Sequence, residues 1–292
     1  MMHSCTLCPR ECGADRENGI GFCGAGKQIK LARAALHNWE EPCISYQAGS
    51  GTVFFSGCSL QCVFCQNFEI SREHKGKEIS VADLSELFLR LQSEGAVNLN
   101  LVNPTHYVLQ IMEALDLVKH KLAIPVVYNT GGYDKAETLK RLEGYIDIYL
   151  PDIKYVSSEL SQKYSSACNY FEIASKAVVE MHRQCGDAVF GSEGEMKKGV
   201  LIRHLVLPSH RADSKRVLEF IASTFDVSKT AISLMRQYFP TYQTSAYKEI
   251  NRRLTTLEYD DVVGFARTLG FQIGFIQSKE SANSIYVPDF DF

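Results

Sequence analysis

Three cysteines stand close together in the spacing Cys58-x3-Cys62-x2-Cys65. They directly follow an apolar run within residues 52–67, so they occupy the exit of a predicted β-strand. An odd number of thiols leaves one without a disulfide partner, and three thiolates alone do not close a tetrahedral zinc site. A cubane iron–sulfur cluster is instead held by one thiolate per iron. Three thiolates on four irons leave one iron open for a substrate or cofactor, and we interpret this stretch as the catalytic centre.

Four further cysteines precede this group, namely Cys5, Cys8, Cys12 and Cys23. Residues 1–26 are rich in glycine and poor in apolar residues, so burial alone does not explain how this segment folds. A bound metal would supply the missing stabilisation. Four thiolates can close a structural zinc site, and they can equally hold a second iron–sulfur cluster that passes electrons. The spacing does not choose between zinc and a cluster.

The composition is that of an ordinary globular protein, with 292 residues, 45% hydrophobic residues, 22% charged residues and a net charge of −3. No block of like charge predicts a nucleic-acid partner. No apolar run is long enough to span a membrane, and the N-terminus lacks the charged and apolar regions of a signal peptide. We therefore expect a cytoplasmic protein. Seven of its ten cysteines fall into the two groups above, which in such a protein favours metal binding over disulfides.

Strands and helices alternate from residue 50 onward, which indicates βαβ units and a parallel sheet. About six such units fit a partial barrel, whose chemistry gathers at the C-terminal ends of the strands. We expect a Cys-rich extension and lead-in over residues 1–49, the barrel over residues 50–278 and a tail over residues 279–292. The predicted strands span residues 52–56, 96–102, 124–128, 145–150, 200–207, 230–234 and 271–276.

The lead-in of residues 28–50 contains a short apolar run at positions 29–36 and then a loop around Pro42. His37, Glu40 and Glu41 lie in this stretch and could be site residues, although a solvated or hydrogen-bonded loop is the more common role of such residues. Cys43 stands alone and is expected to be a packed thiol.

The three-cysteine motif, with Phe64 just before its last cysteine, resembles the signature of the radical S-adenosylmethionine (SAM) superfamily. Its wider context resembles the activase-like branch of the pyruvate formate-lyase activating enzymes. The matching context consists of Gly57-Cys58 at the start of the loop, Cys65-Gln66-Asn67 at its end, Tyr128-Asn129-Thr130-Gly131-Gly132, Asp152-Ile153-Lys154 and Ile202-Arg203-His204-Leu205-Val206-Leu207-Pro208.

This resemblance implies an α/β fold, a partial (β/α)6 TIM-like barrel, with a [4Fe–4S] cluster on Cys58, Cys62 and Cys65. SAM would chelate the fourth iron, and reductive cleavage of SAM would yield methionine and a 5′-deoxyadenosyl radical that removes hydrogen from a substrate. The implied electron donor is reduced flavodoxin or ferredoxin, and the implied partner is a glycyl radical enzyme. We expect a monomer.

The resemblance also assigns roles to single residues. Phe64 would lie near the adenine of SAM, and Asn129 and Gly131 would form a turn that the cofactor approaches closely. Asp152 and Lys154 would lie near SAM and the substrate as the catalytic pair. Arg203 could hold the SAM carboxylate through charge-assisted hydrogen bonds. Since adjacent residues of a strand face opposite sides, only one of Arg203 and His204 can point into the barrel.

One departure from the family pattern concerns the second strand. The Gly-Gly-Glu sequence that binds the SAM amino group is absent, and Asn103-Pro104-Thr105-His106 stands in its place. Asn103 and Thr105 are substitutes by position. His106 could be a ligand or an acid, but a surface position at a helix N-terminus is the first expectation for it. In addition, the extra cysteines precede the radical motif, whereas activases with extra clusters place them after it.

These departures leave the substrate open. A radical SAM enzyme that acts on a small molecule or on another peptide is the first alternative. The second is a non-enzymatic protein that binds a metal or an iron–sulfur cluster for regulation or electron transfer. The barrel pattern behind the central three thiols counts against this last alternative.

Overall fold

The structure is a computed structural model that describes residues 4–282, 288 and 290. Its sheet has the strand order β10-β9-β8-β6-β5-β4-β2-β1-β3, and β7 pairs with β8 outside this path. The strands are β1 (Ile29–His37), β2 (Ser50–Phe55), β3 (Lys77–Ile79), β4 (Leu99–Val102), β5 (Val126–Thr130), β6 (Ile148–Pro151), β7 (Val189–Phe190), β8 (Met196–Leu205), β9 (Ala231–Met235) and β10 (Ile273–Ile276).

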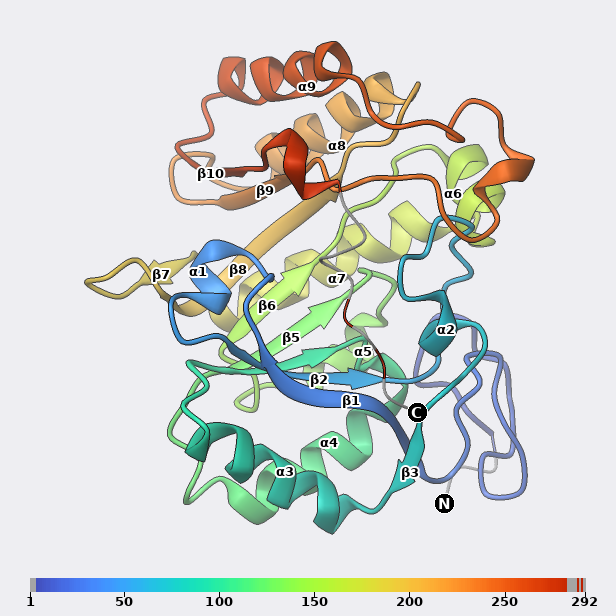
Figure 1. The fold of residues 1–292 in the computed structure, drawn as a ribbon, viewed down its shortest axis with the longest axis vertical. Helices are drawn as coiled ribbons and strands as arrows, with labels where there is room; N and C mark the ends of the chain where they lie inside the picture. Colours follow the sequence, from blue (N-terminus) through green and yellow to red (C-terminus); the bar gives the residue numbers. More distant parts are fainter. Residues whose placement is uncertain (1–3, 283–287, 289, 291–292) are drawn as a thin grey trace.

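Helices follow most of these strands (Figure 1). They are α1 (Pro42–Ser45), α2 (Phe68–Ser71), α3 (Val81–Ser93), α4 (Val108–Val118), α5 (Ala136–Lys140), α6 (Ser158–Ser165), α7 (Tyr170–Cys185), α8 (Arg211–Thr224) and α9 (Thr256–Thr268). The start of α3 shows how locally the sequence sets these bounds. The side chain of Ser80 accepts a hydrogen bond from the Asp83 backbone N–H, and the Asp83 carboxylate accepts one from the Ser80 N–H, which together form a capping box.

The strands from β2 to β10 along the sheet pair in parallel, as the alternation of strands and helices predicts. The curved sheet forms a partial barrel with the longer helices packed on its outer face (Figure 1). The core between sheet and helices is apolar because alternate strand residues face it, as Leu99 and Leu101 of β4 do. The intervening residue Asn100 faces the interior of the barrel, which we call the lumen.

Residues before β2 also belong to this sheet. The apolar run that we expected to be a lead-in is strand β1, which pairs antiparallel with β2 and carries β3 on its other edge. The domain boundary proposed at residue 50 falls between these two paired strands. The division of the chain into domains stays a prediction.

The segment between β1 and β2 enters the barrel. Cys43 and Ile44 of α1 pack against lumen-facing residues of β5, β6, β8 and β9, and so fill one end of the lumen. Cys43 is therefore a packed thiol, as expected.

Candidate active site at the strand exits

The three cysteines of the central motif line one cavity of about 190 Å³, which we call the thiol cavity. This cavity lies at the C-terminal ends of the parallel strands, where β2 runs into the cysteine loop. Residues from the ends of β4, β5, β6 and β8 complete its wall. Those relevant to the site are Asn103, Asn129, Gly131, Asp152, Lys154 and Arg203.

Each thiol has a polar partner that fixes its direction. The Leu60 backbone N–H donates to Cys58 Sγ over 3.4 Å. The Sγ atoms of Cys62 and Cys65 lie 3.0 Å from Ser165 Oγ and 3.1 Å from Ser71 Oγ, respectively. The thiols thus surround a shared space from three sides.

The thiols suit a cluster better than a single ion. Among the described residues, no group of three or more His, Cys, Asp or Glu side chains is arranged to hold one metal ion. A cubane cluster is larger than an ion, so its ligands must border a cavity rather than meet at a point, and these three do. Burial raises the pKa of Cys58 to about 12 and that of Cys65 to about 11, so their ionisation at neutral pH requires a bound cation.

The start of the cysteine loop depends on a glycine. Gly57 has φ +93°, in the region that glycine adopts without strain. A Cβ atom there would also collide with the backbone carbonyl of Cys23. That carbonyl accepts a hydrogen bond of 3.0 Å from the Cys58 N–H, so the N-terminal segment is bonded directly to the loop.

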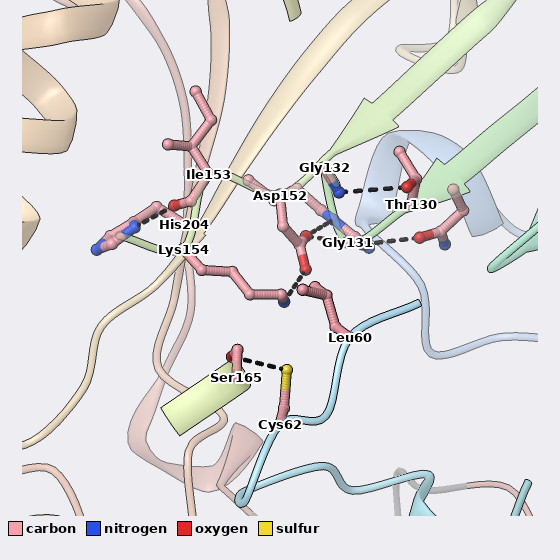
Figure 2. Close-up of polar contacts among 12 residues, drawn as sticks. Leu60, Cys62, Thr130, Gly131, Gly132, Asp152, Ile153, Lys154, Ser165 and His204 are labelled. Atoms are coloured by element: carbon pink, nitrogen blue, oxygen red, sulfur yellow. Dashed lines mark hydrogen bonds and ion pairs between the residues drawn. The ribbon is translucent and has the colours of Figure 1, made fainter. Parts of the chain in front are cut away.

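Asp152 and Lys154 face the thiols from the end of β6 (Figure 2). Lys154 Nζ lies 2.5 Å from Asp152 Oδ2, and the ammonium group points toward the side of the cavity that carries Cys62. Burial alone would raise the pKa of Asp152, but Arg203 and Lys154 beside it hold that pKa below its usual range. Burial likewise opposes the charge of Lys154, but Asp152 and Cys62 keep its pKa above its ordinary value. Both groups are therefore charged at neutral pH.

The turn after β5 supports this pair. Gly132 has φ +82°, and a Cβ on it would collide with the backbone carbonyl of Asp152. The hydroxyl of Tyr170 lies 2.8 Å from the carbonyls of both Gly131 and Asp152. It also accepts a hydrogen bond from the Lys154 N–H. The two strand exits are therefore joined by backbone contacts that only glycine permits at position 132.

Arg203 points into the lumen and His204 points away from it. The imidazole of His204 lies 2.7 Å from the Ile153 carbonyl and 2.8 Å from Ser214 Oγ of α8. The Arg203 guanidinium bonds to three lumen side chains, namely Asp152, Asn129 and Glu40. A direct bond from Arg203 to the SAM carboxylate would add to these contacts or replace one of them, and this role stays a prediction.

Glu40 and Glu41 take the less common of the two roles considered for them, since they lie at the site rather than in a solvated loop. Both line a second cavity of about 180 Å³, the lumen cavity, which shares Asn129 and Arg203 with the thiol cavity. Glu40 accepts hydrogen bonds from Arg203 and Asn129 at 2.9 and 2.7 Å, and Glu41 is only 4% exposed. Neither is a surface residue, because the segment that carries them is folded into the barrel. Only their tertiary partners reveal this, since a Glu-Glu-Pro sequence is typical of an exposed loop.

The residues after β4 divide between the cavity and the wall behind it. The amide of Asn103 bridges the cysteine loop, since it donates to the Gly57 carbonyl and lies 3.6 Å from Cys58 Sγ. Thr105 instead donates to Asp134 behind the strand, 2.7 Å away, and does not line the thiol cavity. His106 is 1% exposed and contacts the Ser56 carbonyl at 2.8 Å, so the surface position expected for it is wrong.

Phe64 is buried under the loop, where its ring packs edge-on against Tyr238 at 6.0 Å between centroids. It does not line either cavity. A role beside the adenine therefore stays a prediction for Phe64, as SAM contacts do for Asn103 and Thr105.

The N-terminal cysteines gather in one place. Cys5, Cys8 and Cys23 are buried, and Cys12 is exposed. The Sγ atoms of Cys12 and Cys23 lie 3.4 and 3.6 Å from the Cβ position of Gly21, so a side chain there would enter the space between them. Cys5 and Cys12 also interact through a side-chain hydrogen bond.

Comparison with known proteins gives the family. Residues 52–221 match the family model described as the radical SAM superfamily. The uncharacterized protein MJ0674 of Methanocaldococcus jannaschii is 31% identical over 273 residues, which cover 90% of this chain and 74% of that protein. The uncharacterized protein MJ0808 of the same organism is 27% identical over 51% of this chain and 49% of its own length.

Solved structures of SuiB show the same fold. Streptococcus suis SuiB bound to the precursor peptide SuiA has a TM-score of 0.52 at 12% identity, with 76% of this chain covered. The chain spans about half of the length of SuiB, 46%. A domain of pyruvate-formate lyase-activating enzyme from Bacteroides vulgatus gives a TM-score of 0.42 at 15% identity, over 59% of this chain and 93% of that domain.

No helix in the described part of the chain is both long and apolar enough to cross a membrane. The family match covers more than half of the chain and includes the three cysteines of the thiol cavity, the Asp152–Lys154 pair and Arg203. Membership implies an enzyme that uses SAM and a [4Fe–4S] cluster. The chain belongs to the radical SAM superfamily.

Proposed function

We propose that this chain is an activating enzyme of the pyruvate formate-lyase activating type, which removes a hydrogen atom from a backbone glycine of a glycyl radical enzyme. Cys58, Cys62 and Cys65 would hold the cluster, which would supply the electron for reductive cleavage of SAM to methionine and the 5′-deoxyadenosyl radical. A reduced flavodoxin or ferredoxin is the proposed source of that electron. We further propose that the enzyme works in the cytoplasm as a monomer.

The observation that carries the proposal is the position of Lys154. Its ammonium group is held by Asp152 over 2.5 Å, and both residues line the same cavity as the three thiols. A buried charged pair can orient a bound group through fixed electrostatics without rearranging. In this role Asp152 keeps Lys154 charged and directed at the thiol cavity, while Arg203 on β8 fixes Asp152 from its other side.

A second candidate function is hydrogen abstraction from a small molecule or from another peptide. The lumen cavity favours it, because this cavity is small and lined by charged and amide side chains, including Glu40, Glu41 and Arg203. Small polar cavities of this kind fix the orientation of a ligand through a few placed polar groups.

Isotope transfer separates these substrates. Cell extract from the source organism, grown with glycine deuterated at Cα, is divided by ultrafiltration and incubated anaerobically with the reconstituted enzyme, SAM and reductant. Deuterium in 5′-deoxyadenosine from the protein fraction supports the glycyl proposal. Deuterium that comes only from the small-molecule fraction of cells grown in D2O supports the second candidate and contradicts the first. The Cys62→Ala variant serves as the control that lacks a ligand thiol.

We also propose that Cys5, Cys8, Cys12 and Cys23 bind a metal, either zinc or a second iron–sulfur cluster. The approach of the Cys12 and Cys23 thiols to Gly21 supports this, because a group bound between these two thiols needs the space that a side chain at position 21 would fill. The bond from the Cys58 N–H to the Cys23 carbonyl means that a metal here would also stabilise the start of the central loop.

A further inference from the structure

Glu41 has a carboxyl group with only half of its hydrogen-bonding capacity used. The side chain is 4% exposed, and its Oε1 accepts a hydrogen bond of 2.8 Å from Ser233 Oγ on β9. Its Oε2 atom is buried and has no hydrogen-bond partner among the described residues. Buried carboxylate oxygens are normally paired, because an unpaired one keeps the full cost of losing water.

Neither protonation state of Glu41 gives Oε2 a hydrogen-bond partner among the described residues. As a carboxylate, Oε2 is an acceptor without a donor, and as a carboxylic acid it carries a hydrogen without an acceptor. The residue also lines the lumen cavity, a space that a ligand can enter. The arrangement therefore points to a group other than the described residues.

The hydrogen-bond donors of Arg203 are already engaged. Arg203, the closest candidate counter-ion, gives its Nε to Asp152, Nη1 to Glu40 and Nη2 to Asn129. Asn100, which donates to Glu40 from β4, has a buried Oδ1 without a partner. Both unmatched atoms near the lumen are oxygen acceptors, so the site lacks donors rather than acceptors.

The charges of the residues that line the two cavities also favour a positively charged ligand. Among the described residues that line the two cavities, the carboxyl groups are those of Glu40, Glu41 and Asp152, whereas the cations are Lys154 and Arg203. Apart from the cluster-binding thiols, one carboxylate is in excess. A buried charge without a partner is costly, so a positively charged ligand group would relieve both the charge and the missing hydrogen bond.

We propose that the lumen cavity binds a cationic nitrogen of the substrate, an ammonium or a guanidinium group, through Glu41 Oε2. This inference rests on the proposed hydrogen abstraction and specifies the chemistry of the substrate that undergoes it. The amino group of SAM is not the ligand meant here, because Glu41 does not line the thiol cavity at which SAM is expected.

Isothermal titration calorimetry on the anaerobic holoenzyme with SAM tests this proposal. The probes are n-butylammonium chloride and methylguanidinium chloride, with n-butanol as the neutral counterpart of the first. We expect the wild type to bind a cation at least about tenfold more tightly than n-butanol, since a hydrogen bond to a charged group accounts for such a factor. The Glu41→Gln variant, which keeps the shape and removes the charge, should lose this preference.

Matched variants keep the result interpretable. Glu113→Gln removes an exposed carboxylate from α4 and should bind the probes like the wild type. If Glu41→Gln does not fold, Glu41→Asp retains the charge on a shorter arm and should keep the preference for cations at lower affinity. Equal affinity of the wild type for n-butylammonium and n-butanol, no binding of either cation, or unchanged cation binding by Glu41→Gln would overturn the proposal.

The proposed function is measured separately, as 5′-deoxyadenosine formed by the wild type. If the wild type cleaves SAM but shows no preference for cations, the cation site alone is wrong. If it binds cations but cleaves no SAM, the proposed function is wrong.

Discussion

Asp152 and Arg203 lie on neighbouring strands, and the guanidinium contacts Oδ1 of the carboxylate through Nε at 3.0 Å and through Nη2 at 2.9 Å. The second carboxylate oxygen is left for Lys154. One buried carboxylate thus holds two cations, one directed at the thiol cavity and one at the lumen cavity. The Asp152 carboxylate therefore links the thiol cavity to the lumen cavity.

Replacing Asp152 with Asn should therefore destabilise the protein by about 3 kcal/mol, because the buried Lys154 loses its counter-ion and Arg203 keeps only Glu40. Denaturant unfolding under anaerobic conditions measures this loss. The control is Glu172→Gln, which breaks the exposed ion pair with Lys176 on α7 and should change stability little. Equal losses in the two variants would show that the buried pair has no special role.

The glycine at position 132 offers a second test. Gly132 and Gly144 have nearly the same φ, +82° and +85°, but only Gly132 has a neighbour that a Cβ would meet, the Asp152 carbonyl. Gly144→Ala should lower the free energy of unfolding by about 1 kcal/mol, because alanine is strained in the left-handed backbone conformation at this position. Gly132→Ala should lower the free energy of unfolding clearly more and should also reduce SAM cleavage, since the Asp152 carbonyl moves together with the Asp152–Lys154 pair. Equal unfolding free energies for both variants would refute the close approach.

Stability should depend on pH through Glu41. Burial, with Glu40 adding to it against the opposing charge of Arg203, raises the pKa of Glu41 to about 7. The unfolded state has a glutamate pKa of about 4.3, so between these values the folded state binds more protons and stability falls as the pH rises. The wild type should thus lose up to about 3 kcal/mol from this group between pH 4.5 and pH 7.

The Glu41→Gln variant lacks this titration. Its stability relative to the wild type should increase from pH 4.5 to pH 7 and stay level above that, as measured by urea unfolding at each pH. A difference that does not change with pH, or that changes in the opposite direction, would contradict the burial of Glu41.

Metal content tests the N-terminal cysteines. The Cys58/Cys62/Cys65 triple-Ala variant should retain a metal on Cys5, Cys8, Cys12 and Cys23, measured by inductively coupled plasma mass spectrometry. Zinc identifies a structural site, and iron with labile sulfide identifies a second cluster. A protein that folds without iron or zinc would show that the N-terminal segment needs no metal.

The sequence was most informative where local rules act. The alternation of β and α segments predicted the parallel sheet and placed Cys58 and Asp152 just after strands. The opposite directions of Arg203 and His204 also followed from strand geometry alone. The resemblance to a family added the chemistry of the three thiols.

What the sequence could not show depends on contacts between distant segments. Glu40 bonds to Arg203 across 163 positions, and no local pattern signals that its loop folds into the barrel. His106 was misplaced for the same reason, because the cysteine loop and the N-terminal segment cover it. These polar residues are buried by tertiary contacts between distant segments. Helix and strand periodicity reports only local structure and therefore does not reveal such contacts.

The most direct test of the central assignment is the formation of 5′-deoxyadenosine from SAM by the anaerobically reconstituted and reduced protein. The wild type should show the brown [4Fe–4S] chromophore and form 5′-deoxyadenosine, and the Cys62→Ala variant should form none. A fully loaded and reduced wild type that leaves SAM intact, or a Cys62→Ala variant as active as the wild type, would contradict the assignment.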